Sequence, residues 1–303
     1  MSLQAQEQAL LDLLFDDRLR ARFAAEGPAA LAGRDLEPGE LEDFAAVRAD
    51  ALELDAGMRR SMVLSELAVS YPLSFAVASC IDDGVELLRE LVDARTLRTP
   101  AIERAVVFGR RLRELLDDGI DEPPRGALRT ILETELGMAW TAASLRREAI
   151  DLGRPPAEPA AVPQDWRTVP VRVAAFVSAA VLPVSHAVLR AALCPVSDRE
   201  LWRHLSRQPA DAATLRTLLA SAEPRLLVAR AEIDRRSRCD PTARHQLVEV
   251  SEGFASILGY ANWQNSIDDL LAELGRSGAS DEVRDGVAAG FEELLRAGML
   301  EPA

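Results

Sequence analysis

Histidine and cysteine side chains are the groups best suited to bind a metal ion or attack a substrate, and this sequence has few of them. They are His186, His204, His245, Cys80, Cys194 and Cys239. No two histidines have the spacing that places metal ligands on one helical turn, and no two cysteines form a Cys-x-x-Cys motif. We therefore expect no metal or other cofactor in this chain and no disulfide framework. An enzyme of unknown class, with a site that His186, His204 and Cys194 form only after folding, is kept as an alternative.

Charge and composition limit the kinds of partner. The net charge of −14 opposes binding to nucleic acid and to anionic membranes, because both are polyanions. The longest apolar run, residues 173–184, is too short to span a bilayer. The N-terminus has no basic segment followed by an apolar one, so we expect no signal peptide and a cytoplasmic location.

The first half of the chain shows helical periodicity throughout. Few aromatic residues and many alanines and leucines favour packed helices over large sheets. Helices are predicted over residues 4–15, 17–25, 41–54, 58–70, 74–80, 84–94, 100–116 and 125–150. Pro72 must bend or break the chain between two of them. Residues 153–163 contain four prolines and form the clearest linker.

The fold class predicted is mainly α, with a helical N-terminal bundle and a small α+β winged-helix domain at the C-terminus. The predicted segments are a helical domain over 1–154, a linker with connecting helices over 155–223, and the winged-helix domain over 224–303. Residues 169–193 are either one bent helix or a strand and a helix, with a break at Pro183. A capping box at Ser197 and an N-cap at Asp211 predict two short helices after it.

The C-terminal segment has two apolar stretches with strand character, residues 225–230 and 246–250, joined by an arginine-rich turn or wing over 235–244. Three amphipathic helices follow, with predicted N-caps at Ser251, Ser266 and Ser280 and a loop over 259–265 between the first two.

The charge of the last helix argues against DNA recognition. Between residues 281 and 296 it carries five carboxylates and only two arginines. In a major groove these carboxylates would face phosphates. A winged-helix transcriptional regulator is therefore the weaker alternative.

Two stretches carry a family resemblance. The order of residues 246–258, 266–271 and 283–300, with its Leu-x-x-Ala-Gly-Met-Leu ending, resembles the PqqD-like recognition element of enzymes that make ribosomally synthesised, post-translationally modified peptides. Residues 10–23 resemble small helical modules of the small subunit of extradiol protocatechuate dioxygenases, which suggests a docking module.

The resemblance implies a binding site for the leader of a precursor peptide. The leader would add as a strand beside residues 246–250 and pack against the last helix. The residues that the resemblance assigns to peptide binding are Gln246, Leu247, Val248, Glu249, Val250, Arg284, Val287 and Phe291. No catalytic residue is expected among them.

The whole arrangement is similar to the partner subunits of multinuclear non-haem iron enzymes of the methanobactin type. In that family the iron is held by the oxidase subunit, and the partner forms a heterodimer with it and presents the precursor peptide. The resemblance thus implies a non-catalytic, peptide-binding protein with an iron oxidase and a precursor peptide as its partners.

Overall fold

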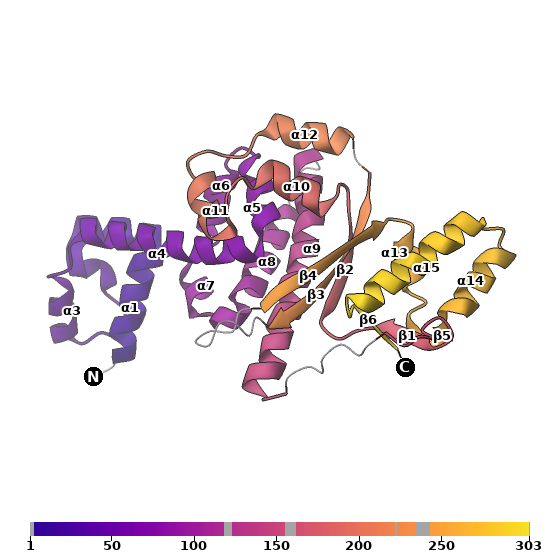
Figure 1. Ribbon diagram of the computed structural model, residues 1–303. Coiled ribbons are helices and arrows are strands. Elements are labelled where there is room, and N and C mark those ends of the chain that lie inside the picture. Colours follow the sequence, from indigo (N-terminus) through magenta and orange to yellow (C-terminus); the bar gives the residue numbers. More distant parts are fainter. Residues whose placement is uncertain (1–2, 118–122, 155–161, 222, 234–242, 303) are drawn as a thin grey trace.

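The computed structural model describes residues 3–117, 123–154, 162–221, 223–233 and 243–302. The protein is mainly helical, with two small antiparallel sheets of three strands each among these residues. Figure 1 shows a helical unit at the N-terminal end, a central helical body, and a sheet that separates this body from the C-terminal helices. The mainly α fold class is confirmed at this level.

The N-terminal unit has a core of its own. This core consists of apolar side chains that are buried against one another. Its members come from the segment between Ala9 and Ala56 and include Leu13, Leu31 and Phe44. Its elements are α1 (Leu3–Phe15), α2 (Asp17–Glu26), the 3-10 helix η1 (Gly27–Leu31), α3 (Pro38–Phe44) and the first part of α4 (Ala49–Ser70). The helix predicted over residues 41–54 is therefore wrong, because the chain ends α3 at Phe44 and begins a new helix at Ala49.

The central body surrounds the break between α4 and α5. Pro72 is the first residue of α5, and the two helices are bent by 114°. Tyr71 is fully buried at this corner and donates a hydrogen bond from its hydroxyl to Ala105 O at 2.7 Å. The helices of the central body that follow α4 are α5 (Pro72–Ser79), α6 (Gly84–Glu90), α7 (Ala94–Arg98), α8 (Ala101–Asp117), α9 (Pro123–Arg146), α10 (His186–Leu193), α11 (Asp198–Leu205) and α12 (Ala212–Ala220). A π-helix, η2 (Arg147–Asp151), extends α9.

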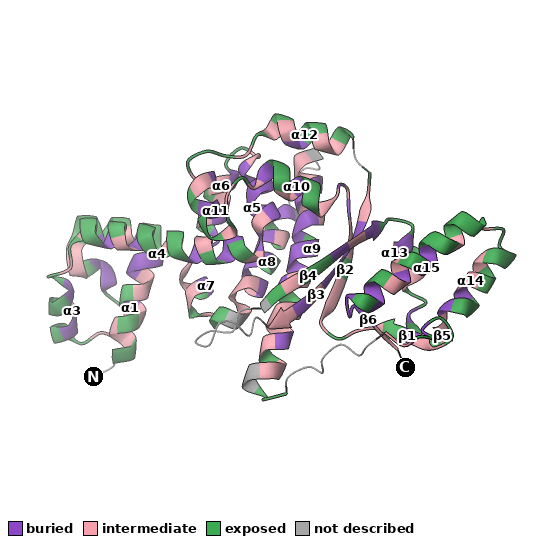
Figure 2. Ribbon diagram, in the orientation of Figure 1, coloured by how far each residue is buried: buried purple, intermediate pink, exposed green. Residues whose placement is uncertain are grey.

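The central sheet has the order β2-β3-β4, and all its pairs are antiparallel. Its strands are β2 (Val177–Leu182), β3 (Arg225–Ile233) and β4 (Ala243–Ser251). Successive side chains of a strand point to opposite faces. On β3, Leu227 accordingly belongs to the core of the helical body, while Leu226 and Val228 belong to the C-terminal core. Most of β3 is buried for this reason (Figure 2).

The C-terminal core lies on the other face of this sheet. It is covered by α13 (Phe254–Leu258), α14 (Ile267–Arg276) and α15 (Asp281–Arg296). A second sheet, with the order β5-β1-β6, joins β1 (Pro170–Val173), β5 (Asn262–Ser266) and β6 (Leu300–Pro302). Gly298 has a φ of 64° directly after α15, which allows the chain to turn into β6.

Several local predictions are corrected by long-range strand pairing. The predicted loop over 259–265 contains β5, because these residues pair with β1 far away in the sequence. Residues 169–193 form two strands and a helix. Ser251 is the last residue of β4 and does not cap a helix, since the N-cap of α13 is Gly253.

The segment between the two predicted domains contributes to both cores. Leu182, Leu189 and Leu201 are buried with the helical body, and Trp166 and Val171 with the C-terminal helices. The proline-rich linker lies partly outside the described residues, as does most of the predicted arginine-rich wing, including Cys239. No single described helix is both long and apolar enough to cross a bilayer, although α4 and α5 together reach that length and composition across their bend.

Candidate functional site

The predicted peptide-binding strand is β4, and it is an edge strand. All nine of its residues are in register with β3, from Ala243 opposite Ile233 to Ser251 opposite Arg225. Within the described ranges, no backbone hydrogen bond reaches the other side of β4. The backbone N–H and C=O groups on that side are thus available to a further strand.

The five predicted strand residues differ in exposure. Gln246 and Leu247 are exposed, while Val248 and Val250 are buried in the C-terminal core. Glu249 is half-buried and accepts a hydrogen bond from Ala187 N at 3.0 Å, at the start of α10. The exposed part of the strand is therefore its first half.

The side chain of Gln246 connects β4 to the end of α15. With its amide nitrogen turned toward the acceptors, it donates to Ala297 O at 3.1 Å and to Glu232 Oε1 at 3.2 Å. This contact fixes the C-terminal end of α15 beside the strand.

The three predicted helix residues do not form an open groove wall. Val287 and Phe291 are buried, and the Phe291 ring lies 5.0 Å from the Phe254 ring, centroid to centroid. Arg284 forms an ion pair with Asp281 in its own helix. Val287 and Phe291 thus hold α15 against the sheet, and the structure leaves only the strand half of the predicted site exposed.

The described histidines and cysteines do not form a common site. In the described part of the chain, no three His, Cys, Asp or Glu side chains lie close enough together to hold a metal ion. Burial lowers the pKa of His186 and of His245, and His245 Nε2 lies 3.0 Å from Met138 O. Burial also raises the pKa of the Cys194 thiol to about 11, so this group is not a thiolate near neutral pH.

A buried carboxylate that sequence reasoning missed lies under the bend between α4 and α5. Glu135, on α9, accepts hydrogen bonds from Leu73 N at 2.8 Å and from Ser74 N at 2.9 Å. These N–H groups belong to the first turn of α5, where no helical carbonyl can accept them. Burial raises the Glu135 pKa to about 7 against the opposite effect of the two N–H groups.

The sequence contains only a partial signal for this contact. Pro72 at the start of α5 indicates a helix N-terminus inside an apolar stretch, and buried N–H groups need an acceptor. Nothing local identifies Glu135 as that acceptor, because it is about sixty residues away in the sequence. We interpret Glu135 as a structural cap and not as a catalytic group.

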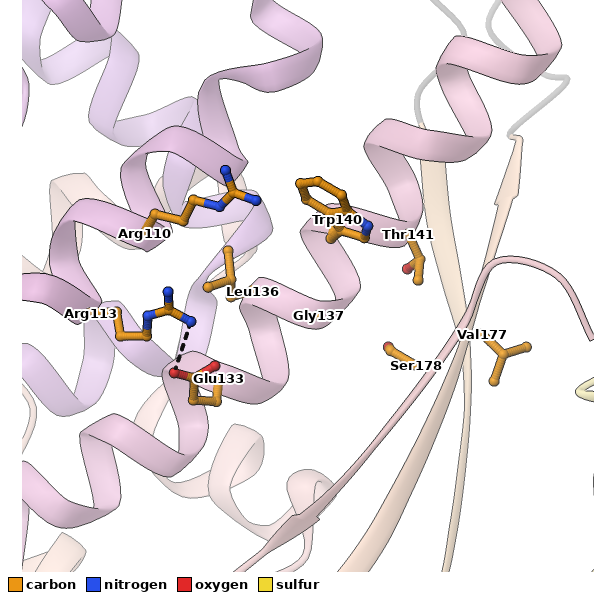
Figure 3. A pocket seen from close by; sticks show the side chains of 9 residues that line it. All are labelled: Arg110, Arg113, Glu133, Leu136, Gly137, Trp140, Thr141, Val177 and Ser178. Carbon is orange, nitrogen blue, oxygen red and sulfur yellow. Dashed lines mark ion pairs between the residues drawn. The ribbon is translucent and has the colours of Figure 1, made fainter. Parts of the chain in front are cut away.

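A shallow cleft lies at the opposite edge of the central sheet from β4. Its volume is about 420 Å³, and its walls come from α8, α9 and the start of β2. Figure 3 shows the side chains of Arg110, Arg113 and Trp140 around its opening, with Ser178 across from them. No sequence motif joins these residues, which come from three separate segments of the chain.

Comparison with family models, curated proteins and solved structures found no match for this chain.

Proposed function

We propose that this protein is a non-catalytic partner protein that binds the leader of a ribosomally made precursor peptide. It would present the core of that peptide to an iron-dependent oxidative enzyme, with which it forms a complex in the cytoplasm. The observation that carries the proposal is the open side of β4, together with the resemblance of its sequence to PqqD-like recognition elements.

The mode of binding is the addition of a strand to a sheet edge. The peptide backbone pairs with the free N–H and C=O groups of β4, and this pairing is independent of the peptide's side chains. Gln246 and Leu247 are exposed on opposite faces of the sheet and can contact the side chains of the peptide on either face. Because β4 is held by β3 and by the buried residues Val248 and Val250, it needs no rearrangement to receive a partner.

The N-terminal unit supports the second part of the proposal. It has its own core and lies at the far end of the protein from α13–α15 (Figure 1). A unit in this position can contact the oxidative enzyme while β4 holds the peptide.

The test uses two neighbouring proline variants of the full chain, Gln246→Pro and Leu247→Pro. The N–H groups of consecutive strand residues point to opposite sides of the strand. Ala231 N donates to Phe176 O on the β2 side of β3, so Arg230 and its partner Gln246 face each other and the N–H of Leu247 points outward. Leu247→Pro therefore removes no backbone bond to β3, whereas Gln246→Pro removes one together with the side-chain contact to Ala297. Leu247→Pro should keep the melting temperature of the wild-type protein, whereas Gln246→Pro melts lower.

The measurement is mass spectrometry of what copurifies with each variant from its native cytoplasm. The wild-type protein should retain a short precursor peptide and an iron-containing protein. The proline variant with a normal melting temperature should lose the peptide, and Arg276→Gln, an exposed change on α14, should not. Retention of the peptide by both proline variants, or recovery of DNA with the wild-type protein, would contradict the proposal.

A further inference from the structure

The cleft beside β2 is lined by an unusual set of side chains for so acidic a protein. Two arginines and one glutamate are charged among its lining residues, whereas the chain as a whole has a net charge of −14. The remaining lining residues are uncharged, and the largest is Trp140, which is 51% exposed. A positive cleft with an exposed aromatic wall attracts a ligand that is both anionic and apolar.

Arg110 is the cation that is available to such a ligand. Its guanidinium carbon lies 4.8 Å from the centroid of the Trp140 ring, and among the described residues no carboxylate pairs with it. When a guanidinium group stacks on an aromatic ring, its N–H groups point outward in the guanidinium plane and stay free of the ring. They can therefore donate to a carboxylate without giving up the contact with Trp140.

Arg113 is partly neutralised by its neighbour. Its Nη1 lies 3.5 Å from Glu133 Oε1, and both side chains are close to half exposed. This ion pair is long and exposed, so it is weak. Arg113 thus adds a second guanidinium group to the cleft. Glu133 adds the one carboxylate among the lining residues, and this carboxylate opposes an anionic ligand.

Helix α9 and strand β2 lie close together at the cleft, because Gly137 has no side chain to separate them. A Cβ atom at Gly137 would lie 3.4 Å from Ser178 Cβ, so α9 and β2 approach each other closely there. The outer edge of β2 borders the cleft there, because β2 pairs only with β3 in the described part of the chain.

We propose that this cleft binds a carboxylate group attached to an aromatic or other apolar group. Arg110 and Arg113 hold the carboxylate, and Trp140 and Leu136 contact the apolar part. The carboxylate belongs either to a peptide that lies along β2 or to a free organic acid. The site is separate from the peptide site proposed at β4, because it lies at the other edge of the sheet.

The test is a titration of the full-length, nitrogen-15-labelled protein with N-acetyl-phenylalanyl-glutamate amide. The chain has four tryptophans, so the indole N–H resonances are few, and Trp140→Phe assigns the one at the cleft. The Trp140 resonance should shift and saturate with this probe, while those of the buried Trp166 and Trp202 stay in place. The probe with glutamine in place of glutamate should bind about fivefold more weakly, as expected for the loss of an exposed ion pair.

Two variants separate the roles of the charged residues. Arg110→Gln should weaken binding of the glutamate probe about fivefold. Glu133→Gln should strengthen it about threefold, because Arg113 is then released from its ion pair. A gain of affinity cannot come from damage to the fold, so Glu133→Gln keeps the test decisive if Arg110→Gln proves unstable. Arg276→Gln serves as the control and should leave the affinity unchanged.

Phenylacetate distinguishes the two sources of the carboxylate. If it binds as tightly as the glutamate probe, the ligand is a free acid; if it binds much more weakly, the peptide backbone contributes and the ligand is a peptide. The proposal is overturned if the Trp140 resonance does not move, if the glutamine probe binds equally well, or if Glu133→Gln lowers the affinity. None of these results bears on peptide capture at β4, which is measured with different variants.

Discussion

Glu135 is held away from water at the first turn of α5, and this position makes its protonation part of the folding equilibrium. In the folded protein its pKa is raised from 4.5 to about 7 by burial. At a pH between these two pKa values, Glu135 keeps its proton in the folded state and has released it in the unfolded state. The contribution of this group to stability is therefore greatest below about pH 4.5 and falls as the pH rises toward 7.

The variant Glu135→Gln isolates this effect. The wild-type protein should lose on the order of 3 kcal/mol relative to the variant as the pH is raised from about 4.5 to about 7, at 1.36 kcal/mol per pKa unit. Denaturant unfolding of both proteins at several pH values measures this difference.

The half-buried histidines His186 and His245 do not affect this comparison. Burial lowers the pKa of His186 and of His245, so their contributions change in the opposite direction with pH. Both proteins contain them, and they cancel in the difference. Parallel pH profiles for the two proteins would show that Glu135 does not titrate in this range.

At the scale of single elements, the helix starts of the C-terminal module provide a matched pair of serines. Ser266 caps α14, because its Oγ accepts from Asp269 N at 3.1 Å and its N–H donates to Asp269 Oδ2 at 3.1 Å. Ser251 was predicted to do the same for the preceding helix, but it lies in β4.

Replacing each serine by alanine tests this difference. Ser266→Ala should lower the free energy of unfolding by about 1 kcal/mol, the usual cost of losing an N-cap. Ser251→Ala, an exposed change with no cap to lose, should stay within about 0.5 kcal/mol of the wild type. Denaturant unfolding measures both, and equal losses would mean that Ser251 acts as a cap after all.

The elements that the sequence predicted correctly are those with local signals. Ser266, Ser280 and Asp211 all cap the helices that they were expected to cap. The hairpin of β3 and β4 follows from apolar strands that are close in the sequence. β5 was missed because its partner β1 is almost a hundred residues away, and a polar stretch such as 262–266 has no strand pattern of its own.

The same distinction applies to the candidate sites. The strand pattern of residues 246–250 predicted that they form a strand, but it did not separate the exposed Leu247 from the buried Val248 beside it. The cleft could not be predicted, because it combines α8, α9 and β2, and only their packing brings Arg110 to Trp140 and Gly137 to Ser178.

At the scale of the whole molecule, the three cores are connected to different degrees. The helical body and the C-terminal helices share β3, whose neighbouring residues Leu227 and Val228 point into one core each. A change in either core therefore acts on the same strand. The described residues of the N-terminal unit belong to neither sheet, and the unit continues into the body through α4 (Figure 1).

Arg60, in the middle of α4, forms a polar link between the N-terminal unit and the body, in addition to the ion pair of Arg98 with Asp12. Its guanidinium group donates to Phe15 O at 3.1 Å and Asp17 Oδ1 at 2.9 Å on one side, and to Val92 O at 3.3 Å on the other. Phe15 is the last residue of α1 and Val92 lies two residues after α6, so the long arginine side chain donates to carbonyl groups outside its own helix.

Replacing Arg60 by alanine should loosen the N-terminal unit without unfolding the body. We expect amide hydrogen exchange in α1 and α2 to become about tenfold faster, which corresponds to about 1.4 kcal/mol, while exchange in β3 stays unchanged. Arg59→Ala is the matched control, because Arg59 lies on the exposed side of the same helix and, in the described part of the chain, forms an ion pair with Asp55 of that helix alone. Faster exchange in β3 would show that all three cores unfold together, and equal effects of the two variants would show that Arg60 makes no special link between the unit and the body.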